Sequence, residues 1–309
     1  MTALRIVFAG SPAAAVPSLR ILDQSQHQII AVITRADSPQ GRKAVSAPTP
    51  VADYAAEHDI ESIRQNRLGD EVTERVRNFA PDLGVIVAYG ALVREPLLSA
   101  PRLGWINLHF SLLPRWRGAA PVQHAIIAGD STTGAAVFQL VKDLDAGEVF
   151  AQIERPIDAQ QTAGALLDAL ATDGAELLLR VIDSIADGTA RSQPQIGEVT
   201  VAPKLSLSDG EVQWRRPAST VFAQLRGVTP EPGAFTILDG VRLKILEAAI
   251  ARESPRIAPG EFRQVGKTVL VGTTSEPIEL VSVHPAGKRA MNAADWWRGR
   301  PSGSTLVAE

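Results

Sequence analysis

The feature that most constrains the fold of this chain is the alternation of short apolar runs with helical stretches over its first two hundred residues. Apolar, β-branched runs at 4–9, 29–34 and 83–88 are each bounded by turn-forming residues, and the segments 17–22 and 70–79 between them have helical spacing. Strands that are apolar on both faces and separated by helices are typical of a parallel sheet covered on both sides. We therefore expect an α/β fold with a doubly wound, mostly parallel, Rossmann-like sheet, whose ligands bind at the carboxyl ends of the strands.

The pattern changes in the last third of the chain. A helix rich in Ala and Leu is expected over 163–188, and the polar, Pro-containing segment 189–205 indicates a linker. Beyond it, short β runs separated by turns predict a second, smaller β-barrel domain of the OB-like kind. A length of 309 residues also favours two domains, which we place at 1–188 and 206–309.

Composition excludes several kinds of chemistry. The chain has no cysteine, which rules out disulfides, thiolate metal sites and a cysteine nucleophile. Its five histidines are scattered, so we expect no metal site built by the protein. After the first predicted strand, Gly10-Ser11-Pro12 stands where a dinucleotide-binding protein carries a Gly-x-Gly-x-x-Gly loop. Nucleotide cofactors therefore lose most of their support.

Charge and hydropathy bear on partners and location. Residues 1–205 hold 18 Lys and Arg against 23 Asp and Glu, whereas residues 206–309 hold 13 against 11. A basic second part is compatible with a polyanionic partner, although an excess of two charges is common on ordinary surfaces. No apolar run approaches the roughly 18 residues of a membrane span, and the apolar run near Met1 is too short for a leader peptide. We expect a cytoplasmic protein with no membrane partner.

Two segments hold candidate chemistry. In the predicted strand 106–110, Asn107 and His109 point to the same face, next to a loop rich in Pro and Gly. By itself such a pair is more often structural than catalytic, because buried polar groups usually complete hydrogen bonds. Farther on, Asp145 and two other acids surround Gly147. They form either a solvated loop or a carboxylate that orients a histidine and favours its protonated form, and spacing alone leaves both readings open.

These segments also carry a resemblance. Asn107-x-His109, the run Ser-Leu-Leu-Pro-Arg-Trp-Arg-Gly-Ala-Ala-Pro at 111–121 and Leu-Asp-Ala-Gly at 144–147 closely resemble the folate-dependent formyltransferases, specifically those that act on methionyl-tRNA. The segments 227–235 and 285–291 resemble the C-terminal domain of the same enzymes, in the same order. The resemblance spans nearly the whole chain, and the central run is its most specific part.

The resemblance implies a transferase. It implies transfer of the formyl group of 10-formyltetrahydrofolate to the free amino group of initiator methionyl-tRNA, without a metal. Residues 1–188 become the formyl-folate-binding catalytic domain and 206–309 a tRNA-contacting domain. Asn107 and His109 become hydrogen-bond donors to the oxyanion formed from the formyl carbonyl, and Asp145 maintains His109 and helps to carry the proton.

Binding segments follow from the resemblance as well. The folate is expected along the loop 111–114, with its pterin toward 89–90, and the tRNA acceptor stem against the loop 34–50. The folate residues are Ser111, Leu112, Leu113, Pro114, Tyr89 and Gly90, and the tRNA residues are Arg35, Arg42 and Lys43. Candidates for a basic face are Arg215, Arg216, Arg226, Lys244, Lys288 and Arg289.

The chain also departs from the family. Members commonly carry lysines where this chain has Ala44 and Val45, and a tryptophan where it has Glu231. Two alternatives stay open: a formyltransferase acting on a small amine, such as a nucleotide sugar or glycinamide ribonucleotide, and a non-catalytic module that binds folate or RNA. We expect a monomer, although the sequence does not determine the oligomeric state.

Overall fold

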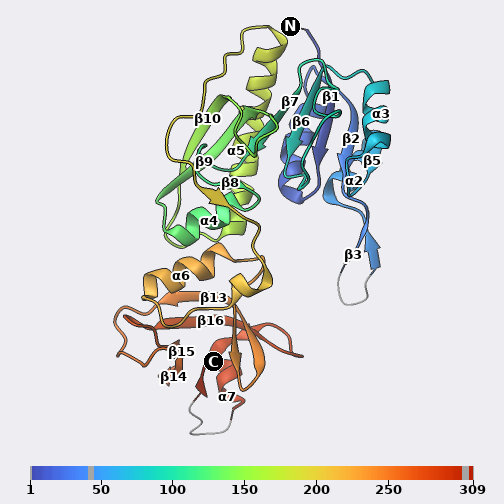
Figure 1. Ribbon diagram of the computed structural model, residues 1–309. Helices are drawn as coiled ribbons and strands as arrows, with labels where there is room; N and C mark the ends of the chain where they lie inside the picture. Colours follow the sequence, from blue (N-terminus) through green and yellow to red (C-terminus); the bar gives the residue numbers. More distant parts are fainter. Residues whose placement is uncertain (1, 41–44, 301–305, 309) are drawn as a thin grey trace. The chain divides into compact units, whose positions relative to one another are not determined.

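The computed structural model describes residues 2–40, 45–300 and 306–308 (Figure 1). Its contacts divide the chain into two compact units. The first comprises residues 1–121, 132–156 and 167–202, and the second comprises 122–131, 157–166 and 203–309. The division follows contacts rather than chain order, so two short central segments cluster with the C-terminal part. Domain boundaries at 188 and 206 stay a prediction.

A seven-stranded sheet forms the centre of the first unit, in the order β10-β9-β7-β6-β1-β2-β5. Five strands run parallel, and β9 and β10 join them antiparallel at one edge. The predicted doubly wound, mostly parallel sheet is thus confirmed. The strands are β1 (Arg5–Gly10), β2 (Gln28–Thr34), β5 (Ser62–Arg64), β6 (Leu83–Val87), β7 (Trp105–His109), β9 (Thr132–Gln139) and β10 (Val149–Pro156).

Helices join these strands. Helix α2 begins where the side chain of Thr49 accepts a hydrogen bond from the Ala52 N–H, and Pro50 occupies its first turn, both typical of a helix start. Two short pairs of strands complete the first unit: β3 (Ser38–Gln40) with β4 (Val45–Ala47), and β8 (Arg117–Gly118) with β11 (Val201–Ala202). The helices of this unit are η1 (Ala13–Ala15), α1 (Val16–Asp23), α2 (Pro50–Glu57), α3 (Asp70–Asn78) and most of α5 (Ala163–Ala186). Helix α4 (Pro121–Ala128) belongs almost wholly to the second unit.

The two faces of strand β7 have different neighbours. On one face, Leu108 is buried, and Gly174 of α5 lies so near that an added Cβ would come within 3.0 Å of the Leu108 side chain. Helix α5 therefore covers the Leu108 face. Since side chains alternate along a strand, Asn107 and His109 point away from α5.

The second unit contains an antiparallel sheet in the order β12-β13-β16-β15-β14-β18, with β17 paired to β16. The rings of Trp214, Phe262 and Trp296 meet edge to face in its core. A smaller β domain is thus confirmed. No pairing that closes β12 onto β18 occurs among the described residues, so the barrel stays a prediction. Its elements are η2 (Leu207–Gly210), α6 (Ala218–Gly227), β12 (Phe235–Leu238), β13 (Val241–Ile250), β14 (Glu261–Val265), β15 (Thr268–Val271), β16 (Ile278–Pro285), β17 (Met291–Asn292), α7 (Ala293–Arg298) and β18 (Leu306–Val307).

Within the described ranges, none of the helices combines the length and the apolar character that crossing a bilayer requires.

Close packing beside the site makes one glycine indispensable. Gly84 of β6 pairs with Trp105 of β7, and a Cβ added at Gly84 would lie 2.1 Å from the buried indole. The indole cannot easily withdraw, because its Nε1 donates to the Leu97 carbonyl at 2.9 Å. We expect Gly84→Ala to lower the free energy of unfolding by about 3 kcal/mol, measured by urea denaturation.

The matched control for this prediction is Gly69→Ala. Gly69 precedes α3, and an added Cβ there would meet no atom within 4 Å. Its cost should stay below about 1 kcal/mol, the usual loss for alanine at a helix N-cap. Equal midpoints for the two variants would contradict the packing argument.

Candidate active site

The candidate site lies where β6 and β7 end. Asn107 and His109 share the face of β7 that points away from α5, and the chain then turns into the loop 110–118. Strand β6 ends at Val87 and leads into 88–90. The carboxyl ends of neighbouring parallel strands meet at one edge of the sheet, which is where ligands bind in folds of this kind.

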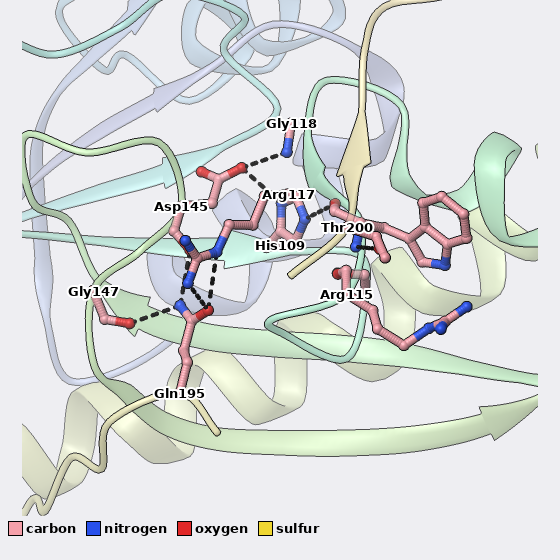
Figure 2. Close-up of polar contacts among 10 residues, drawn as sticks. His109, Arg115, Arg117, Gly118, Asp145, Gly147, Gln195 and Thr200 are labelled. Carbon is pink, nitrogen blue, oxygen red and sulfur yellow. Dashed lines mark hydrogen bonds and ion pairs between the residues drawn. The ribbon is translucent and has the colours of Figure 1, made fainter. Parts of the chain in front are cut away.

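His109 is held at both ring nitrogens. Its side chain is 6% exposed, and Nε2 lies 2.9 Å from the Trp116 carbonyl oxygen, which can only accept. Nε2 therefore carries a proton. Nδ1 lies 3.8 Å from Oδ2 of Asp145 (Figure 2). The Phe138 ring meets the imidazole edge to face, with the ring centroids 6.4 Å apart. The structure thus brings His109 and Asp145 together, as the resemblance implied.

Asp145 differs from the two acids beside it. Asp143 and Glu148 are exposed, whereas Asp145 is 8% exposed and turns inward. Its Oδ2 accepts a hydrogen bond of 2.7 Å from the Gly118 N–H. The backbone of Asp145 has φ +46°, in the left-handed region that few side chains adopt. The solvated-loop interpretation therefore fits its neighbours, and Asp145 is the carboxylate that faces the imidazole.

The electrostatics of His109 differ from our expectation. Burial lowers the pKa of its imidazole, and this outweighs the opposite effects of the Asp145 charge and the Trp116 carbonyl. We expected Asp145 to favour the protonated ring. The Asp145 charge does raise the pKa of the imidazole, but the removal of the ring from water lowers that pKa by a larger amount. His109 is therefore neutral at pH 7.

Asn107 completes the group. Its side chain is partly exposed, and its amide makes no hydrogen bond with another described residue. A half-buried amide on a rigid strand, without a protein partner, is available to a ligand. Such an amide donates its N–H at any pH.

Comparison with known proteins shows the family of this chain. The formyl transferase family model matches residues 4–182, and the model of the formyl transferase C-terminal domain matches residues 204–301. This chain belongs to the formyl transferase family. Among its relatives, the methionyl-tRNA formyltransferase of Clavibacter michiganensis subsp. michiganensis is 58% identical over 96% of this chain and 97% of its own. That of Mycobacterium sp. strain KMS is 46% identical over 99% of this chain and 100% of its own. The resemblance found in the sequence is confirmed.

Solved structures share the fold of this formyl transferase. A variant of HypX from Aquifex aeolicus matches with a TM-score of 0.69 at 17% identity, over 96% of this chain. This chain spans about half the length of HypX, 48%. WlaRD, a sugar 3N-formyl transferase, matches with a TM-score of 0.68 at 17% identity, over 92% of this chain and 98% of its own.

In this formyl transferase, the predicted folate loop uses its side chains for packing. Ser111 is fully buried, and its hydroxyl donates to the Arg115 carbonyl at 2.6 Å. Leu113 is buried with its carbonyl accepting from Gln152, and Leu112 packs on Gly134, where an added Cβ would clash with it. Pro114 is buried as well. What this loop offers a ligand is therefore mainly backbone.

The second predicted folate-binding segment, 89–90, is bound by Arg35, a residue that the sequence analysis assigned to tRNA binding. Tyr89 is buried, which raises the pKa of its phenol, and its hydroxyl donates to the Gln65 carbonyl at 2.7 Å. Arg35 donates from Nε to the Tyr89 carbonyl at 3.4 Å and from Nη2 to the Gly90 carbonyl. Arg35 thus lies with 89–90. Arg42 and Lys43 lie outside the described residues.

The predicted linker supplies residues that the sequence did not single out. Thr200 accepts a hydrogen bond from the Trp116 N–H at 2.9 Å, and β11 pairs with β8. Gln195 contacts Arg117 and the turn 145–147 (Figure 2). The segment that we expected to connect two domains therefore forms a wall of the candidate site. Its polar composition indicated a linker, and nothing in the sequence distinguishes linker residues from site residues.

No cluster of three His, Asp or Glu side chains able to hold a metal ion occurs in the described part of the chain.

The lowered pKa of His109 is measurable. Histidine-selective NMR should give His109 a titration midpoint below the ordinary value of 6.5. Asp145→Asn should lower the midpoint further, because it removes the attraction that favours the charged ring. His109→Gln assigns the resonance.

The same shift has a consequence for stability. Below pH 6.5 the imidazole of His109 binds a proton in the unfolded chain but not in the folded protein. Lowering the pH from 6.5 to the pKa of the folded state should therefore reduce the free energy of unfolding. His109→Gln should remove that part of the pH dependence. A midpoint above 6.5 would contradict the neutral ring.

Proposed function

We propose that this chain transfers the formyl group of 10-formyltetrahydrofolate to the free amino group of initiator methionyl-tRNA. The single observation that supports it most is the juxtaposition of Asp145 with His109 on the β7 face that also carries the unpaired amide of Asn107. It occurs in a chain 58% identical to a methionyl-tRNA formyltransferase over 96% of its length.

The reaction has a simple balance of bonds. The amine nitrogen of the methionyl group attacks the formyl carbon, a new C–N bond forms, and the carbonyl oxygen becomes an oxyanion. The carbonyl then re-forms while the bond from carbon to the folate N10 breaks. One proton moves from the attacking nitrogen to N10. The products are N-formylmethionyl-tRNA for translation initiation and tetrahydrofolate.

Asn107 and His109 stabilise the oxyanion in this proposal. The amide of Asn107 donates without having to leave a protein partner. A neutral imidazole can also polarise a carbonyl through an N–H. For His109 this is the Nε2 proton, which the oxyanion shares with the Trp116 carbonyl. Fixed donors at such a position are worth about 3–4 kcal/mol each in known oxyanion sites.

Asp145 carries the proton. Its Oδ2 is held by the Gly118 N–H, which leaves Oδ1 to accept a proton from the attacking amine. The carboxylate then passes that proton to N10 as the bond to carbon breaks. The Asp145 carboxylate thus acts first as a general base and then as a general acid, and it forms no covalent bond with the substrate.

The folate loop suits a heterocycle that makes paired hydrogen bonds. Among the described residues, the backbone N–H groups of Leu112 and Leu113 have no acceptor, and the Tyr89 and Gly90 carbonyls lie at the end of β6. A pterin ring carries both donors and acceptors along its edge. We place 10-formyltetrahydrofolate, the co-substrate, between these backbone groups.

For tRNA, we propose the second unit as a contributing surface. Arg215, Arg216 and Lys244 are exposed there, as are Lys288 and Arg289, so all five can reach phosphates. Arg226 fits this role less well, because it is half buried and donates to the Asp158 and Gln161 carbonyls. Since the proposed substrate is initiator tRNA, we also propose a cytoplasmic location, and a monomer remains our expectation.

The central test is Asn107→Ala. We expect kcat for formyl transfer to fall by about 100- to 1,000-fold, because one oxyanion donor is lost, while the dissociation constant for the folate stays within about twofold. Transfer of labelled formyl to methionyl-tRNA gives kcat, and folate binding is measured by calorimetry. Asn78→Ala is the matched control, since Asn78 is exposed at the end of α3.

Asp145→Asn should abolish turnover as well, because an amide of the same shape cannot take the proton. If Asn107→Ala and Asp145→Asn both turned over like the wild type, the assigned roles would be wrong and a non-catalytic module would regain support.

The acceptor can be tested independently. Purified protein with labelled 10-formyltetrahydrofolate should formylate charged initiator tRNA at least about 100-fold faster, by kcat/KM, than an amino-sugar nucleotide or glycinamide ribonucleotide. This ratio corresponds to about 3 kcal/mol of extra transition-state binding, within the range that buried contacts provide. A higher kcat/KM for either small amine would contradict the proposed tRNA acceptor and would identify that amine as the formyl acceptor.

A further inference from the structure

Gln195 stands out because its side-chain amide is fully used. The NH2 group donates to the carbonyl oxygens of Asp145 and Gly147, both at 2.8 Å. The oxygen accepts from Nε of Arg117 at 3.1 Å and from Nη2 at 2.6 Å (Figure 2). Two donors and two acceptor sites are all that an amide has. The orientation is unambiguous, because a flipped amide would face carbonyls with its oxygen and a guanidinium with its NH2.

The donating side of Gln195 acts on a strained turn. Asp145 has φ +46°, a conformation that costs a non-glycine residue free energy unless the surroundings impose it. Gly147 is constrained as well, since a Cβ there would lie 1.7 Å from the Gln139 carbonyl oxygen. The NH2 group of Gln195 bridges the carbonyls at both ends of this turn. It thereby stabilises the backbone that points the Asp145 carboxylate at His109.

The accepting side of Gln195 acts on the neighbouring loop. Arg117 lies between Trp116, whose carbonyl accepts the His109 proton, and Gly118, whose N–H binds the Asp145 carboxylate. Holding the guanidinium of Arg117 therefore holds a strand with contacts to both members of the His109–Asp145 pair. One amide connects the two segments that set the distance between imidazole and carboxylate.

We propose that Gln195 is a positioning residue for formyl transfer, which holds the Asp145 carboxylate in register with His109 through the carbonyls of Asp145 and Gly147. This inference rests on the proposed function, because it takes Asp145 as the group that moves the proton. Gln195 itself touches neither substrate nor reacting atoms. Its effect on the rate comes from placement, and a displacement of about 1 Å at a catalytic group can cost on the order of 100-fold.

Two substitutions test the inference. Gln195→Met keeps the length of the side chain and removes all four hydrogen bonds. Gln195→Glu keeps the acceptor for Arg117, but it replaces both donations to the turn by a carboxylate oxygen that faces two carbonyl oxygens, and it adds a negative charge. We expect both variants to lose about 10- to 100-fold in kcat, with KM for the folate and for methionyl-tRNA within about threefold. Gln264→Met, at an exposed position of β14, is the matched control.

A pH profile separates positioning from a merely structural role. Loss of folded protein would lower kcat equally at every pH. Displacement of Asp145 weakens its attraction for the protonated ring, so the acid limb of kcat should move to lower pH in Gln195→Met and not in Gln264→Met. Circular dichroism and folate binding give the folded fraction, to which kcat is referred. If Gln195→Met does not fold, the kcat of Gln195→Glu, which differs from the wild type only in the replacement of the NH2 group by an oxygen, tests the role of Gln195.

The outcomes distinguish this inference from the proposed function. Wild-type kcat in Gln195→Glu, with Asp145→Asn inactive, would overturn the role of Gln195 alone. Full activity in Asp145→Asn would overturn the catalytic assignment on which the inference rests. A loss in Gln195→Met that Gln195→Glu restores would also overturn it, because that result would assign the effect to Arg117 and not to the turn.

Discussion

The alternation of side chains along β7 is the constraint on which the site depends. Leu108 is buried on the face that α5 covers, and Asn107 and His109 necessarily point the other way. A shift of one residue in the register of β7 would place two polar groups against α5 and Leu108 in the site. The close fit of Trp105 over Gly84 opposes such a shift. The packing of Leu108 and Trp105 therefore fixes which side chains of β7 face the candidate site.

Burial gives the site its electrostatic character. His109 and Asp145 are both largely removed from water, and the loss of hydration outweighs the attraction between a charged ring and the carboxylate. The ring is therefore neutral, with one proton fixed on the side of Trp116. A neutral donor beside a carboxylate suits a reaction that develops negative charge on oxygen and moves one proton.

Residues distant in the chain from Asn107, His109 and Asp145 complete the candidate site. Gln195 and Thr200 come from a segment whose composition is that of a linker, yet they bind Arg117 and Trp116 in the loop after β7. Left-handed residues such as Asp145 persist only where several contacts support them. The segment 193–202 provides such contacts, both to the loop after β7 and to the turn 145–147.

The sequence by itself determined the fold class and the segments that form the candidate site. Periodic apolar runs reflect which faces are buried, and the run 111–121 together with Asn107 and His109 is specific enough to identify a family. Only the tertiary structure decided that Arg35 binds the carbonyls at 89–90, that Gln195 belongs to the site and that His109 is neutral. Hydrogen-bond partners and desolvation depend on atoms distant in the chain. Periodicity and motif spacing report only on local neighbours, so they carry no information about either.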